Sequence, residues 1–203
     1  MPTDATDEQL MLRFQGGEAG AFELLLRRHR GPAFSFLCRL TGDRPRAEDL
    51  LQETWLRVVA AAPRWEPRAR FRTWLYTVAR NLAADEARRR SLRRTDPLDA
   101  PGPGGASPAD AMADGGPGPD RAADGALLRP RLEAALAALP EEQREVFLLR
   151  EYAGVPFAEI AEITGVPAPT VKSRMRYALE GLRRALAGMG IGPEADAPEG
   201  TGT

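Results

Sequence analysis

The sequence predicts an all-α protein built from two small helical domains that a disordered linker connects. Apolar residues recur at helical spacing in two separate blocks, residues 1–94 and residues 127–187. Between them, residues 95–126 contain six Pro, seven Gly and six Asp and show no apolar periodicity. Residues 188–203 have a similar composition and should also be disordered. Aromatic residues make up only 6% of the chain, which is few for a β-sandwich or a β-barrel.

The distribution of charge and the N-terminal composition narrow the class of protein further. The net charge is −1, but residues 1–94 carry 18 Arg against 12 acidic residues, while the linker carries a net charge of −5. Such blocks favour a polyanion as a partner. The N-terminus lacks the regions of a signal peptide, and no apolar run approaches the ~18–20 residues that a bilayer requires. We therefore expect a cytoplasmic protein without membrane insertion.

The first domain is predicted to begin with short helices. Thr6 and Gln9 form a capping-box pattern that opens a first helix, which the Gly16-Gly17 pair interrupts. Apolar residues at helical spacing then predict helical segments over residues 21–29 and 32–40.

Two longer helices complete this domain. Residues 45–62 place apolar side chains on one face and polar side chains on the other, at Glu48, Asp49, Gln52, Glu53 and Arg57. The clearest helix begins at Phe71, because apolar residues recur from there at i, i+3, i+4, i+7, i+8 and i+11.

The second domain contains a helix-turn-helix pattern. A helix over residues 127–139 is followed by Pro140 and two glutamates, which suit a new helix start. Residues 156–164 and a long helix from about residue 168 to 186 then flank a turn at Gly165.

The sequence offers little for catalysis. His29 is the single histidine and Cys38 the single cysteine. The chain therefore cannot form an internal disulfide or a Cys-based metal site, and a catalytic triad would have to use His29. We expect His29 to have a surface or interface role and Cys38 to be a small buried apolar residue. We expect no enzyme activity, cofactor or metal.

The strongest functional signal is the second helix of the helix-turn-helix. Val171, Met175, Ala178 and Leu182 are spaced to pack against the domain. The polar residues of its N-terminal half would then face duplex DNA, although a solvated basic helix without a ligand is the alternative. These residues are Thr170, Lys172, Ser173, Arg174 and Arg176.

The first domain offers two further candidate surfaces. Aromatic and basic residues alternate from Trp65 onward, a mixture that suits unstacked bases and a single-stranded backbone, with Trp74 favoured as a core residue. The acidic face around Asp49 is either a solvated helix face or a docking patch for a basic protein.

Four motifs in order resemble the bacterial RNA polymerase sigma factors of the sigma-70 family, extracytoplasmic-function group. They are Ala47-Glu-Asp-Leu-Leu-Gln-Glu-Thr-Trp-Leu56, Phe71-Arg-Thr-Trp-Leu-Tyr-Thr-Val-Ala-Arg-Asn81, Leu139-Pro-Glu-Glu-Gln-Arg-Glu-Val-Phe147 and Thr170-Val-Lys-Ser-Arg174. The resemblance covers residues 7–94 as the region-two domain and residues 127–187 as the region-four domain.

The resemblance implies specific partners. Asp49, Gln52 and Glu53 would dock on the coiled coil of the polymerase β′ subunit, and the second domain would sit on the β-subunit flap and read the −35 element. It also implies an anti-sigma factor as a partner. The residues that would open and hold the −10 element are Arg68, Arg70, Arg72, Tyr76, Arg80, Asn81 and Arg88.

The sequence departs from the family pattern at two places. Arg176 to Leu179 stand where the family often has a more basic run, and Val155-Pro156 stands where a Ser or Thr cap is common. A two-domain helix-turn-helix regulator that binds duplex DNA without polymerase is the main alternative function. An enzyme with an unrecognised site is the other.

Overall fold

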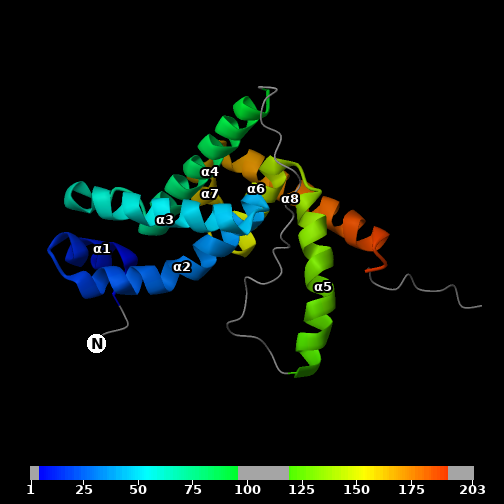
Figure 1. The fold of residues 1–203 in the computed structure, drawn as a ribbon, viewed down its shortest axis with the longest axis horizontal. Coiled ribbons are helices and arrows are strands. Elements are labelled where there is room, and N and C mark those ends of the chain that lie inside the picture. Colours follow the sequence, from blue (N-terminus) through cyan, green and yellow to red (C-terminus); the bar gives the residue numbers. More distant parts are fainter. Residues whose placement is uncertain (1–4, 96–118, 192–203) are drawn as a thin grey trace, which may run out of the picture.

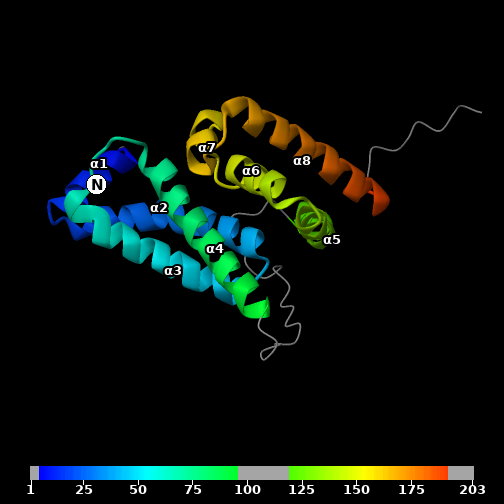
Figure 2. The same cartoon turned by 90° about the horizontal axis from the view of Figure 1, so that it is seen from above.

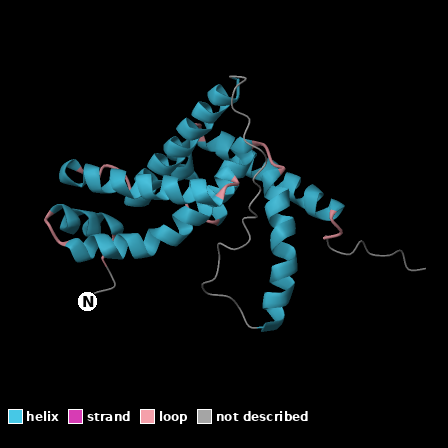
Figure 3. Cartoon of the chain, in the orientation of Figure 1, coloured by secondary structure: helices cyan, strands magenta, loops and turns pink. Residues whose placement is uncertain are grey.

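The computed structural model describes residues 5–95 and 119–191, and every regular element within them is helical (Figures 1 and 3). The predicted all-α class is therefore confirmed. Residues 96–118 and 192–203, which hold most of the predicted linker and tail, lie outside the described residues.

The first domain consists of helices α1 (Asp7–Gln15), α2 (Ala19–Thr41), α3 (Arg44–Ala61) and α4 (Phe71–Thr95), with a short 3-10 helix η1 (Ala62–Arg64) after α3. The capping box at the start of α1 is formed as predicted. Helices α2 and α3 lie side by side, and α4 crosses them (Figures 1 and 2). Their shared core is filled by Leu25, Phe36, Leu51, Phe71 and Leu75.

Helix α2 is continuous where the sequence predicted two segments. Pro32 lies inside it without ending it. A proline in a helix interior loses one backbone hydrogen bond, but Leu25, Ala33, Phe36 and Leu37 are fully buried on either side of it. Burial of this apolar face outweighs the local cost, so the two predicted segments form one helix.

The second domain consists of α5 (Pro119–Ala137), α6 (Glu141–Glu151), α7 (Phe157–Thr164) and α8 (Ala168–Gly188). Gly165 ends α7 with a φ of 70°, the left-handed conformation that the predicted turn requires. Helix α5 begins at Pro119, inside the range 95–126 that the sequence assigned to the linker. Proline at a helix start followed by Asp120 is a favourable opening that the linker composition conceals.

The two domains pack against each other. Helix α4 of the first domain contacts α7 of the second, and α2 contacts α6 (Figure 2). The sequence predicted two separate helical units and contained no signal for this contact.

Candidate nucleic-acid and polymerase interfaces

The long helix α8 presents the predicted reading surface. Val171, Met175, Ala178 and Leu182 are buried, which fixes the orientation of the helix as the spacing predicted. Lys172 is exposed and follows the turn at the start of α8.

The other predicted contacts on α8 have local partners. The Ser173 hydroxyl donates a hydrogen bond to the Thr170 carbonyl at 2.9 Å. The Arg174 side chain is 24% exposed, and its Nη2 lies 4.0 Å from Glu142 Oε1. Arg176 is more exposed, and its guanidinium stacks on Tyr177 with 4.6 Å to the ring centroid. These residues form one polar surface at the start of α8.

The N-terminus of helix α4 is held by the first helix of the chain. The backbone N–H of Phe71 donates to Glu8 Oε1 at 2.9 Å, which satisfies one of the donors at the helix start. In the preceding loop, Arg68 is exposed and pairs with Glu66 at 2.6 Å. Asn81 and Arg88 are exposed on α4 itself. The loop and this helix therefore form a basic surface.

Tyr76 does not belong to that surface. Its side chain is 1% exposed and packs edge-on against Phe36, with ring centroids 5.4 Å apart. Burial raises the pKa of Tyr76. The prediction that this ring contacts DNA is wrong for this conformation, because Tyr76 lies on the core-facing side of α4. Trp74, favoured as a core residue, is partly buried against Phe71.

Three predicted −10 residues contact the second domain. Arg70 Nε lies 3.4 Å from Glu159 Oε1, and Arg72 Nη2 lies 3.6 Å from Glu159 Oε2. Arg80 Nε donates to Glu145 Oε1 at 2.6 Å. Sequence reasoning missed both glutamates.

The predicted docking residues lie on the outer face of helix α3. Asp49 and Gln52 are exposed, and Glu53 Oε1 accepts a hydrogen bond from Arg57 at 3.0 Å. Next to them, a groove of about 720 Å³ runs between α2 and α3. Leu56 and Val59 line it and are 57% and 42% exposed. These apolar side chains were not predicted to belong to the docking face, although Leu56 follows Gln52 by one helical turn.

The single histidine has a structural position. His29 is buried, and its Nε2 lies 2.6 Å from Asp7 Oδ2, so it joins α2 to α1 inside the first domain. Of the surface or interface role predicted for it, the surface position is therefore wrong. Burial alone would raise the pKa of Asp7, but hydrogen bonds from His29 and Arg28 outweigh it and lower that pKa below 3.8. Cys38 is buried as predicted, and burial raises the pKa of its thiol.

Within residues 5–95 and 119–191, no group of His, Cys, Asp and Glu is arranged to hold a metal ion. Among the helices described, none is both long enough and apolar enough to span a bilayer.

Both domains match known protein families. Residues 25–93 match the model of sigma-70 region 2, and residues 129–182 match the model of sigma-70 region 4. The chain belongs to the extracytoplasmic-function group of the sigma-70 family. The resemblance seen in the four sequence motifs is thus confirmed.

Relatives of this sigma factor align over almost the whole chain. It is 30% identical to the RNA polymerase sigma-H factor of Pseudomonas aeruginosa, an alignment covering 92% of this chain and 96% of the relative. It is 36% identical to the sigma factor CarQ of Myxococcus xanthus, covering 87% and 95% of the two chains. The sigma factor SigL of Mycobacterium tuberculosis is also 36% identical, with 86% and 93% covered.

Solved structures have the same fold. The sigma factor RpoE of Bartonella quintana, in complex with the anti-sigma factor NepR, matches with a TM-score of 0.65 at 25% identity, covering 82% of this chain and 96% of that one. CnrH, in complex with the cytosolic domain of CnrY, matches with a TM-score of 0.64 at 21% identity, covering 90% and 97%.

Proposed function

We propose that this protein is a transcription initiation factor that binds core RNA polymerase and directs it to specific promoters. The observation that carries the proposal is that regions 2 and 4 of the sigma-70 family follow each other in one chain. The function is non-catalytic, since the sigma factor positions and opens DNA while polymerase carries out the chemistry. The site of action is the cytoplasm.

The −10 element is opened by the loop before α4 and by α4 itself. Arg68, Arg70, Arg72, Arg80, Asn81 and Arg88 lie in this loop or on this helix. Their guanidinium groups suit the phosphates of a separated strand, and Asn81 suits the edge of an unstacked base. Tyr76 is left out of this set because its ring is buried.

The −35 element is read by the start of α8. Its side chains lie in the first three turns of the second helix of a helix-turn-helix, whose N-terminal part enters the major groove in this motif. Lys172 and Arg176 suit phosphates, and Arg174 suits the bidentate contact with guanine. Thr170 and Ser173 complete the surface.

Core polymerase binds the outer face of α3 through Asp49, Gln52 and Glu53. A basic surface on the β′ coiled coil would meet these carboxylates, and the exposed Leu56 beside them would supply apolar burial. The second domain would rest on the β flap. An anti-sigma factor is a further partner, in keeping with the solved complexes of similar sigma factors.

Transcription on a promoter library tests this proposal. Core polymerase with the protein should start transcripts at a defined set of promoters, whereas core polymerase alone should not. Retention of this chain by immobilised core polymerase should accompany that activity.

The same assay addresses the regulator alternative, which the region 2 match already disfavours. A helix-turn-helix regulator would bind its duplex site without polymerase and would not be retained by immobilised core polymerase. That pair of results would overturn the proposed function.

A further inference from the structure

We propose that helix α1 positions the loop that precedes α4, with Gln15 holding the start of this loop and Glu8 holding its end. The loop consists of residues 66–70, which we call the −10 loop. The inference deepens the proposed function and rests on it, because it takes this loop as part of the surface that opens the −10 element. Glu8 and Gln15 are thereby positioning residues, which act through the loop and not by contact with DNA.

The −10 loop is an exposed segment between two buried aromatic side chains. Trp65 is 7% exposed and Phe71 is fully buried, whereas residues 66–70 are all exposed. Inside the loop, the Arg68 backbone N–H donates to the Glu66 carbonyl at 2.8 Å. Ordering an exposed segment costs conformational entropy, so the conformation of this loop depends on how its two ends are held.

Both ends are hydrogen-bonded to side chains of α1. Gln15 Nε2 donates to the Trp65 carbonyl at 3.2 Å, and the Phe71 backbone N–H donates to Glu8 Oε1 at 2.9 Å. These pairs are 50 and 63 positions apart in the sequence, so neither bond is local. Glu8 and Gln15 are seven residues apart, which places them on one face of α1, about 10 Å apart along its axis.

The bond to Glu8 also supplies a cap that the sequence around α4 lacks. Phe71 is the first residue of α4, and its N–H has no acceptor inside the helix. The residue before it is Arg70, whose side chain offers no acceptor, whereas a local cap would require Ser, Thr, Asp or Asn. A carboxylate from α1 takes that place, and its charge suits the positive end of the helix dipole.

Helix α1 is itself fixed to the domain, so it can serve as a rigid support. Leu10 and Met11 are fully buried. Asp7 pairs with two residues of α2, with Arg28 at 2.8 Å and with His29 at 2.6 Å. The positions of Glu8 and Gln15 are therefore set by the core, and the two side chains transmit them to the loop.

Glu8 lies beside the space in which the proposed function places an unstacked base. Together with Pro67, Ala69 and Arg70 it lines a hollow of about 380 Å³ next to the loop. The last three of these residues belong to the −10 loop, so a shift of the loop changes the shape of the hollow. We therefore expect the two α1 side chains to affect which base is preferred in the −10 element, because such discrimination requires a preorganised site.

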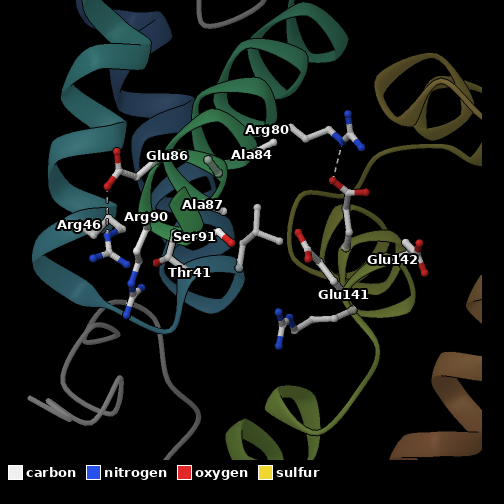
Figure 4. Close-up of a pocket in the computed structure, with 14 residues that line it drawn as sticks. Thr41, Arg46, Arg80, Ala84, Glu86, Ala87, Arg90, Ser91, Glu141 and Glu142 are labelled. Carbon is white, nitrogen blue, oxygen red and sulfur yellow. Dashed lines mark hydrogen bonds and ion pairs between the residues drawn. The ribbon is translucent and has the colours of Figure 1, made fainter. Parts of the chain in front are cut away.

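The opposite end of α4 is held by a contact that does not involve the loop. Figure 4 shows Glu86 of α4 directed toward Arg46 of α3, and their charged groups are 3.9 Å apart. Glu86 follows Phe71 by fifteen residues, about 22 Å along the helix. Glu86→Ala is therefore a matched control, since it removes a carboxylate with a partner on another helix, far from the loop.

Hydrogen exchange in the free protein tests the support. Glu8→Ala should accelerate amide exchange over residues 66–74 about fivefold, the usual effect of losing a helix cap, and Gln15→Ala should accelerate it as well. Glu8→Gln keeps an oxygen that accepts from the Phe71 N–H and should exchange like wild type. Unchanged exchange in Glu8→Ala, or equal acceleration of this segment by Glu86→Ala, would overturn the inference.

Base preference tests the link to promoter opening. Transcription with core polymerase from promoters that differ in one base of the −10 element gives a ratio between the best base and the others. Glu8→Ala and Gln15→Ala should lower this ratio by a similar factor, while Glu8→Gln and Glu86→Ala should keep it. A variant that is only less folded would reduce all transcripts equally. An unchanged ratio in both Glu8→Ala and Gln15→Ala would refute the positioning role.

Failure of the proposed function would look different. In that case wild type would start no transcripts with core polymerase on any promoter, while hydrogen exchange over residues 66–74 would still respond to Glu8→Ala. Failure of the inference alone would leave wild-type transcription intact, with exchange or base preference insensitive to the α1 substitutions.

Discussion

The pair formed by Asp7 and His29 links helix α1 to helix α2 inside the first domain. The pKa of Asp7 is lowered in the folded state, so its ionisation stabilises the fold above its unfolded pKa of about 3.8. That stabilisation is lost as the pH falls through the folded value.

Asp7→Asn should therefore lower the free energy of unfolding by ~1–3 kcal/mol at neutral pH, because His29 and Arg28 lose a charged acceptor. The difference from wild type should shrink toward zero at acid pH, where wild-type Asp7 is protonated as well. Urea unfolding at the two pH values measures this, with the exposed Glu23→Gln on α2 as control. A difference that stays constant with pH would contradict the role of the Asp7 charge.

Arg174 on helix α8 is predicted to contact the −35 element of the promoter. Arg174→Ala should weaken transcription from promoters with a full −35 element. If Arg174 contacts a base bidentately, the free energy of binding to that element should become less favourable by ~1–3 kcal/mol. A phosphate contact would cost less and would make the salt dependence of DNA binding shallower. Arg184→Ala, on the exposed distal half of the same helix, should change neither property. Unaltered promoter preference together with unaltered salt dependence would show that Arg174 does not contact DNA.

Helix α3 presents its acidic face and an apolar groove side by side. Asp49→Arg with Glu53→Arg should abolish binding to core polymerase, since like charges facing each other across an interface cost several kcal/mol. Both side chains are directed away from the core, so circular dichroism should remain that of wild type. Retention on immobilised core polymerase measures the effect, and Glu23→Arg on α2 serves as the control. Wild-type retention of the double variant would rule out this face as the docking surface.

Under the proposed function, the whole molecule has to span two promoter elements. By the family resemblance these lie about 16 base pairs apart, or about 55 Å at 3.4 Å per pair. Helix α4 ends at Thr95 and α5 begins at Pro119, so residues 96–118 connect them. Fully extended, this segment reaches about 75–80 Å.

Deleting residues 100–115 would leave a connection of only about 25 Å, and we expect it to cripple transcription from promoters with both elements. Replacing Asp96, Asp99, Asp110 and Asp114 with Ser keeps the length and should spare transcription. The readout is transcription with core polymerase on one-element and two-element promoters. A shortened protein that transcribes both equally would show that reach is not limiting.

Features that depend on neighbours in the chain were accessible from the sequence. Thr6 and Gln9 are three residues apart, so their capping box needs only local geometry. The spacing of Val171, Met175 and Ala178 alone determines which face of α8 is buried. The helix-turn-helix, its basic surface and the family follow from patterns of this kind.

Which polar residues are covered depends on contacts between distant parts of the chain. Tyr76 lies in the sequence among the same aromatic and basic residues as its exposed neighbours. Its burial depends on contact with Phe36, forty positions away. Glu159 meets Thr73 across 86 positions and two domains. Helical periodicity says which side of a helix is buried but contains no information about which distant surface buries it. The separate domains were therefore determined by the sequence, and their closure on each other by packing and charge in three dimensions.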